Sequence, residues 1–159
     1  MKKVRVGTLI IALLIPLLVG GVSAAISMPG MAMYETMNKP PLSPPAWLFS
    51  VAWTILYLIM GFASYIILVS DADMKTKTKA MILYGIQLLM NFMWSIVFFV
   101  WRMYLIAFIW LMIMWCLVIF CTIRFFFIRR PAAYLLVPYV LWLTFAAYLN
   151  LGSYIVNLL

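Results

Sequence analysis

The sequence has no histidine and only three acidic residues, which excludes most kinds of enzyme site. The acids are Glu35, Asp71 and Asp73, and none of them lies within a long apolar run. An acid–base pair, a catalytic triad or a hard-metal site is therefore not expected. Proton relays and ion pumps use charged groups inside the membrane, and these are lacking too. Phosphate-binding loops and dinucleotide fingerprints also do not occur. We predict no metal site and no required cofactor.

Cysteine is scarce as well. Cys116 and Cys121 lie five positions apart in one apolar segment. On a helix this spacing points the two thiols in different directions, so they form neither a redox pair nor a metal pair. Buried apolar side chains are the better interpretation.

Apolar residues dominate what is present. The 159 residues are 69% hydrophobic and 9% charged, and the composition of soluble domains is far less apolar. Lipid is therefore the expected solvent for most of the chain. The net charge is +8, but the basic residues lie in short clusters between apolar runs. This pattern indicates membrane topology and contact with anionic lipid, and no nucleic-acid partner is expected.

Five apolar segments are each long enough to cross a bilayer as a helix, which takes roughly 20 residues. They are too long and too evenly apolar for barrel strands. The fold class predicted is an all-α integral membrane protein, a five-transmembrane-helix bundle forming one domain over residues 1–159. The segments cover residues 6–26, 46–69, 80–101, 103–127 and 132–151, and residues 27–45 form a long first loop.

The first segment allows two interpretations. Basic residues before it and Val22-Ser23-Ala24 near its end resemble a secretory signal peptide. The length of the apolar run favours a retained helix instead. Pro16 should bend this helix. Small residues allow close packing against a neighbouring helix, and they are Gly20, Gly21, Ala24 and Ala25.

Basic residues predict the orientation in the membrane. Nine lie on one side and two, Lys39 and Arg102, on the other. The positive-inside rule then places the N-terminus in the cytoplasm and the C-terminus outside, in the cell membrane. The nine are Lys2, Lys3, Arg5, Lys75, Lys77, Lys79, Arg124, Arg129 and Arg130.

Polar and aromatic residues recur at helical spacing. A proline run ending at Pro45 leads into the second segment, where Trp53 and Tyr57 share a face. One face of the third segment carries Gln87, Asn91 and Trp94. Amides inside a membrane are either hydrogen-bonding contacts between helices or polar points in a ligand cavity, and both interpretations stay open.

The last segment contains Pro138, a predicted kink, and one face with Tyr139, Trp142, Ala146 and Leu149. Such a stripe is typical of packing, although a small alanine beside a tryptophan also leaves room for a flat ligand. The chain has seven Trp, nine Tyr and eleven Phe. Aromatic walls with a few amides suit a planar, apolar ligand.

Three blocks of residues resemble the TspO/translocator protein family, also called tryptophan-rich sensory proteins or peripheral-type benzodiazepine receptors. The first runs from Asn38 to Tyr65 and reads NKP-x-x-x-PP-x-W-x5-W-x-x-LY-x-x-MG-x-x-SY. The second runs from Gln87 to Ser95 and reads Q-x-x-x-N-x-x-WS. The third runs from Pro138 to Asn150 and reads PY-x-x-W-x-x-F-x-x-x-LN. Their order and spacing together are highly specific.

The resemblance implies a five-helix bundle, commonly a homodimer, with a cavity that the first loop, residues 27–45, covers as a lid. It implies binding of porphyrins such as protoporphyrin IX and haem, and of isoquinoline-carboxamide and benzodiazepine drugs. Carried over by motif, the ligand-binding residues are Pro45, Trp47, Trp53, Tyr57, Gln87, Asn91, Trp94, Tyr139, Trp142, Ala146 and Leu149.

Two departures from the family pattern matter. Leu42 stands where members often have tryptophan, and Val51 or Ala52 where they often have proline, so the rim of the cavity should differ in shape. Animal members bind cholesterol through a motif with a basic residue after tyrosine. Here no basic residue follows Tyr154, which argues against sterol binding.

Three functions compete. The first is a porphyrin-binding receptor with a regulatory or stress-related role. The second is an enzyme that degrades porphyrin with light and oxygen, with Trp53 and Trp142 as the catalytic residues; the excited porphyrin would supply the driving force without an acid or base. The third is a tetrapyrrole transporter, which ranks lowest because neither an inverted repeat nor a coupling-ion site is visible.

Overall fold

The computed structural model describes residues 5–157 and contains five helices long and apolar enough to cross a membrane. This confirms the predicted fold class. Residues 1–4, with Lys2 and Lys3, and residues 158–159 lie outside the described part. The helices are α1 (Val6–Thr36), α2 (Ala46–Leu68), α3 (Met74–Ser95) with the π-helical turn η1 (Ile96–Val100), α4 (Tyr104–Ile128) and α5 (Arg130–Val156).

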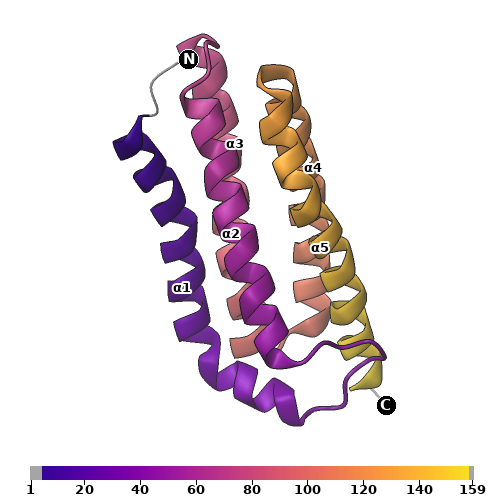
Figure 1. The fold of residues 1–159 in the computed structure, drawn as a ribbon. Helices are drawn as coiled ribbons and strands as arrows, with labels where there is room; N and C mark the ends of the chain where they lie inside the picture. The colour runs from indigo at the N-terminus through magenta and orange to yellow at the C-terminus, as the bar shows by residue number, and fades with distance from the viewer. Residues whose placement is uncertain (1–4, 158–159) are drawn as a thin grey trace.

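The helices are arranged as a closed ring around a shared interior. In order around the bundle, α1 contacts α2, α2 contacts α5, α5 contacts α4, α4 contacts α3, and α3 returns to α1. Figure 1 shows the helices running side by side. The ring brings residues from α2, α3 and α5 together in its interior, although they are far apart in sequence.

The first helix is longer than predicted. It continues ten residues beyond residue 26, to Thr36, so the loop predicted over 27–45 is helical in its first part and only 37–45 is non-helical. The last third of α1 turns under the bundle (Figure 1). Pro29 belongs to this third, and its missing N–H leaves one backbone carbonyl without its helical partner, which allows a bend. The predicted bend at Pro16 remains a prediction.

The linker of residues 37–45 is held against α5. The Tyr148 hydroxyl donates to the Pro41 carbonyl at 2.9 Å, and the Asn157 amide donates to the Asn38 carbonyl at 3.2 Å. Pro40 packs on Gly152 so closely that a Cβ at position 152 would lie 2.5 Å from the proline Cβ. The linker therefore crosses the C-terminal end of α5, where Figure 1 shows it near the C-terminus.

Other helix ends also differ from the prediction. α3 begins at Met74 rather than 80, because the Asp73 carboxylate accepts a hydrogen bond from the Thr76 N–H at 2.9 Å and caps the helix. The hydrogen bonds with Thr76 lower the pKa of Asp73. After η1 the chain turns at Arg102, whose φ of 56° is left-handed, and α4 begins at Tyr104. α5 runs from Arg130 to Val156, beyond both predicted ends of 132 and 151.

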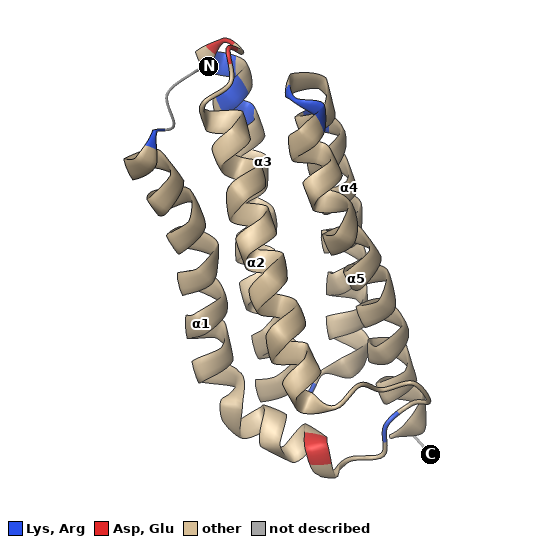
Figure 2. Ribbon diagram, viewed as in Figure 1, with Lys and Arg blue, Asp and Glu red and all other residues tan. Residues whose placement is uncertain are grey.

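Charge is concentrated at one end of the bundle. Figure 2 shows most of the basic residues at the turns between α2 and α3 and between α4 and α5, the end where the N-terminus lies. Arg129 and Asp71 join these two turns through an ion pair of 3.0 Å. The helices make this an integral membrane protein, and the orientation of its termini stays a prediction.

Candidate ligand-binding site

A buried hydrogen-bond network joins α2, α3 and α5 inside the ring. The Tyr57 hydroxyl donates to Asn91 Oδ1 at 2.7 Å, and Asn91 Nδ2 donates to the Tyr139 hydroxyl at 3.0 Å. That hydroxyl in turn donates to Gln87 Oε1 at 3.1 Å. All four side chains are buried. The two amides predicted from helical spacing therefore meet two phenols, and the contact between helices is one role they fulfil.

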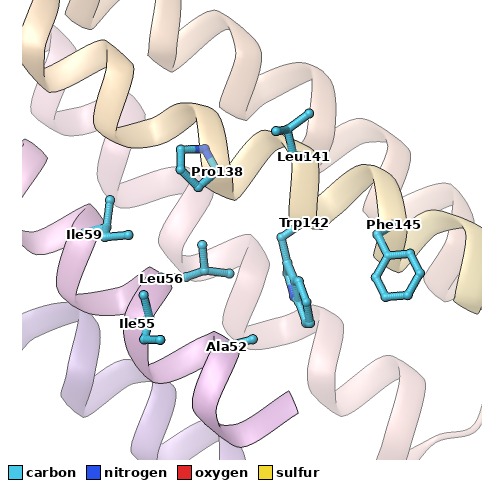
Figure 3. Close-up of a pocket in the computed structure, with 8 residues that line it drawn as sticks. All are labelled: Ala52, Ile55, Leu56, Ile59, Pro138, Leu141, Trp142 and Phe145. Atoms are coloured by element: carbon cyan, nitrogen blue, oxygen red, sulfur yellow. The ribbon is translucent and has the colours of Figure 1, made fainter. Parts of the chain in front are cut away.

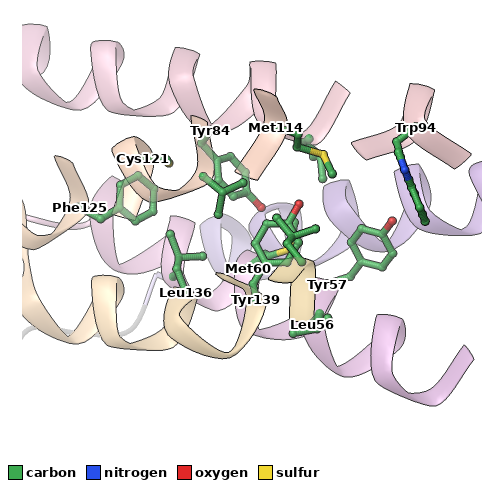
Figure 4. Close-up of a cluster of buried hydrophobic side chains, with 14 of the residues drawn as sticks. Leu56, Tyr57, Met60, Tyr84, Trp94, Met114, Cys121, Phe125, Leu136 and Tyr139 are labelled. Carbon is green, nitrogen blue, oxygen red and sulfur yellow. The ribbon is translucent and has the colours of Figure 1, made fainter. Parts of the chain in front are cut away.

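Trp53 is the centre of an aromatic cluster beside this network. Its ring lies 5.6 Å from Tyr57, 6.3 Å from Tyr139, 6.4 Å from Trp94 and 6.3 Å from Trp142, measured between ring centroids. The Tyr57 ring is stacked on it, whereas Tyr139 and Trp142 approach edge-on. Figure 4 shows Tyr57, Tyr139 and Trp94 within the buried core. The aromatic residues of the three sequence blocks thus converge on one place.

Asn150 is a polar partner for this cluster that sequence reasoning did not assign to the site. With its amide oriented to satisfy its neighbours, Asn150 accepts the Trp94 indole N–H at 3.2 Å and donates to the Tyr104 carbonyl at 2.9 Å. It is 1% exposed. This contact fixes the Trp94 ring between α3 and α5. The sequence signal that could have identified Asn150 was its place as the last residue of the third block, which ends in LN.

A groove of about 420 Å³ lies between α2 and α5, next to the cluster. Figure 3 shows its walls, Ala52, Ile55 and Ile59 on one side and Pro138, Leu141 and Phe145 on the other, with Trp142 between the helices. The Trp142 indole N–H is buried and donates to no described residue. Trp142 thus belongs both to the groove wall and to the Trp53 cluster. The other groove residues were not predicted, because an apolar residue facing a gap looks like one facing lipid.

The remaining predicted residues divide into two groups. Ala146 and Leu149 are buried on α5, in line with the helix face on which they were predicted. Trp47 is 65% exposed at the start of α2, and Pro45 is exposed at the end of the linker. The structure does not bring Pro45 and Trp47 into the aromatic cluster, and their contact with a ligand stays a prediction.

The site offers binding surfaces rather than ionisable groups. Its polar atoms are phenols, amides and indole N–H groups. Within residues 5–157, no three His, Cys, Asp or Glu side chains gather in a way that holds a metal ion. Rings, amides and a free N–H donor are suited to hold a flat ligand by stacking and a few hydrogen bonds.

Comparison with known proteins identifies the family. Residues 12–155 match the TspO/MBR family. The chain is 34% identical over 122 residues to the "Tryptophan-rich protein TspO" of Chlorobaculum tepidum, covering 77% of each chain. It is 35% identical over 124 residues to the "Tryptophan-rich sensory protein" of Cereibacter sphaeroides, covering 78% of this chain and 76% of that protein. This chain belongs to the TspO/MBR family.

Similarity within the TspO/MBR family extends to animal proteins. The "Translocator protein" of Ovis aries is 34% identical over 122 residues, which are 76% of this chain and 72% of that protein. The matched residues 12–155 include all three sequence blocks. The resemblance inferred from those blocks is thereby confirmed.

Proposed function

We propose that this TspO/MBR protein is a membrane receptor for porphyrins, with protoporphyrin IX and haem as ligands, and that it also accepts isoquinoline-carboxamide or benzodiazepine compounds. Its role is regulatory or stress-related. The observation that carries the proposal is the Trp142 indole, which lies in the groove wall, 6.3 Å from Trp53, and keeps an unused N–H donor.

The geometry supports a ligand that enters from the groove. The interior beside Tyr57 and Asn91 is filled by the side chains themselves, which are 7% and 1% exposed. Trp142 stands between this interior and the groove. Because its N–H donates to no described residue, the indole can turn without breaking a hydrogen bond. Turning it would join the groove to the face of Trp53, and its N–H could then donate to a carboxylate or carbonyl of the ligand.

Titration with protoporphyrin IX in detergent micelles, followed by quenching of tryptophan fluorescence, tests the proposal. We expect saturable quenching that weakens in Trp53→Phe/Trp142→Phe. Trp101→Phe is the matched control, because Trp101 lies outside the cluster, is 56% exposed at the end of η1, and its removal should leave the affinity within about twofold. Quenching without saturation, or affinity equally reduced in the control, would contradict a site at the cluster.

A second candidate function is degradation of the bound porphyrin with light and molecular oxygen. The contacts from Trp142 to Trp53 and from Trp53 to Trp94 favour it, since adjacent indoles can donate electrons to an excited ligand. The electron that an indole gives to the excited ligand returns to the indole later in the cycle, so the net reaction is oxidation of the porphyrin by molecular oxygen, which is reduced. A single defined tetrapyrrole product under light, lost in Trp53→Phe, would support this function. Bleaching equal to that of porphyrin in detergent alone would reject it.

We also propose that the protein is a homodimer, as the family resemblance implies. Light scattering with correction for bound detergent would measure the oligomeric state directly. A monomer at all concentrations would contradict this part of the proposal without affecting ligand binding.

A further inference from the structure

A second groove lies on the opposite side of the bundle from the proposed ligand groove, between α3 and α4. Its volume is about 460 Å³. Lys79 and Arg124 line it, together with apolar residues that include Leu83, Ile86 and Phe120. The groove lies within the two membrane-spanning helices and near the end of the bundle where the basic residues gather. It shares no residue with the aromatic cluster.

The basic side chains in this groove are not neutralised by a carboxylate of residues 5–157. Neither Lys79 nor Arg124 forms an ion pair with a described residue, and none of the residues that line the groove is acidic. Of the two acids at this end, Asp71 pairs with Arg129 and Asp73 caps α3. Two exposed cations therefore border an apolar surface without a carboxylate between them.

The charged residues of the groove lie near the end of the bundle, and its apolar residues lie deeper in the membrane. Lys79 and Ile86 are seven residues apart on α3, which is about 10 Å along the helix axis. On α4 the Arg124 guanidinium lies 4.8 Å from the centroid of the Phe120 ring, one turn deeper. Phe127 is 79% exposed beside it. Positive charge thus marks the mouth and apolar side chains mark the inner wall.

We propose that this groove binds one anionic phospholipid, with the head-group phosphate between Lys79 and Arg124 and the upper part of an acyl chain against Leu83, Ile86 and Phe120. Basic pockets between membrane helices are suited to anionic head groups, because the cations gain from a phosphate at the level of the interface. A second copy of the chain is a poorer occupant. In a two-fold contact it would bring four cations together with no groove carboxylate to offset them.

Native mass spectrometry of the full chain, exchanged into an equal mixture of phosphatidylglycerol and phosphatidylcholine with identical acyl chains, tests the proposal. The unaltered protein should retain phosphatidylglycerol in preference. Lys79→Gln/Arg124→Gln should lower that preference about 30-fold, as the loss of two interfacial cations predicts. The matched control is Lys75→Gln/Arg130→Gln, which removes the same charge from the same end outside the groove and should leave the preference within about twofold.

A separate variant tests the apolar wall of the groove. Ile86 is half-exposed, so Ile86→Trp fills the groove without disturbing the core and should reduce the retention of both lipids. An equal loss of preference in the control pair would overturn the proposal, because the effect would then come from general surface charge. Loss of dimer with unchanged lipid retention in Lys79→Gln/Arg124→Gln would also overturn it, in favour of a second copy.

Discussion

Tyr57 on α2 donates its hydroxyl to Asn91 on α3 across 2.7 Å of buried interior. Asn91→Leu keeps a similar volume but leaves this hydroxyl without an acceptor and removes the donor to Tyr139. We expect a loss of about 1–3 kcal/mol in the free energy of unfolding, the cost of unsatisfied buried polar groups. Thermal unfolding in detergent would measure it. Thr54→Ala is the control, because the Thr54 hydroxyl bonds only to its own helix and is exposed.

A double-mutant cycle separates this bond from general packing. Tyr57→Phe alone should cost less than Asn91→Leu, because asparagine can still bond Tyr139. The double variant should lose less free energy of unfolding than the two single variants added together, because the Tyr57 hydroxyl and its acceptor on Asn91 are then both absent. Strict additivity would show that the two side chains do not act as a pair.

Gly61 on α2 allows close approach to α1. A Cβ at position 61 would lie 2.6 Å from the Ala12 carbonyl oxygen and 2.9 Å from the Leu13 Cα, both backbone atoms that cannot move aside cheaply. Gly61→Ala should therefore destabilise the fold by about 1–3 kcal/mol through overpacking. Gly85→Ala is the matched control, because nothing lies within 4 Å of its Cβ position. Equal melting temperatures for the two variants would contradict close packing of α1 on α2.

The existence and number of the helices could be predicted from sequence, but not their ends. A helix that crosses lipid must be long and apolar, so each membrane span can be found from its amino-acid composition. A window of apolar residues marks only the embedded part of a helix. Lys75, Lys77 and Lys79 look like a loop by that measure, yet they lie in the first turns of α3 because Asp73 caps it. Residues 27–36 likewise look like a loop and continue α1.

The helix faces that form the candidate site could be predicted from the sequence, but the contacts between those faces could not. Helical spacing places Trp53 with Tyr57, and Gln87 with Asn91, on common faces. The bond from Trp94 to Asn150 depends on how α3 and α5 are rotated and shifted relative to each other, which no local pattern records. The proposed ligand groove depends on the separation of α2 from α5 in the same way.

The linker should loosen when its contact with α5 is disturbed. Gly152→Ala places a methyl group against Pro40, which is buried there. The linker must then move, and the hydrogen bond from Tyr148 to the Pro41 carbonyl should weaken. Hydrogen exchange measured by mass spectrometry should show faster exchange in residues 37–45. Gly21→Ala, with open space at its Cβ position, should leave that segment unchanged, and slower or equal exchange in Gly152→Ala would contradict the prediction.

The charge distribution predicts the side of the membrane on which each turn lies. In a Cys116→Ala/Cys121→Ala background, single cysteines at Leu42 and Thr78 report the two ends of the bundle. Leu42 is 82% exposed in the linker, and Thr78 lies between Lys77 and Lys79 near the start of α3. If the basic end is cytoplasmic, a membrane-impermeant maleimide should label Leu42→Cys on intact cells and Thr78→Cys only after permeabilisation.

This labelling assay also shows on which side of the membrane the linker is exposed to water. Labelling of both positions on intact cells would indicate two orientations in the same membrane. Labelling of Thr78→Cys alone would reverse the predicted topology and place the basic end outside. The lipid experiment would then concern the outer leaflet, because Lys79 and Arg124 lie at the same end of the bundle as Thr78, whichever side that end faces.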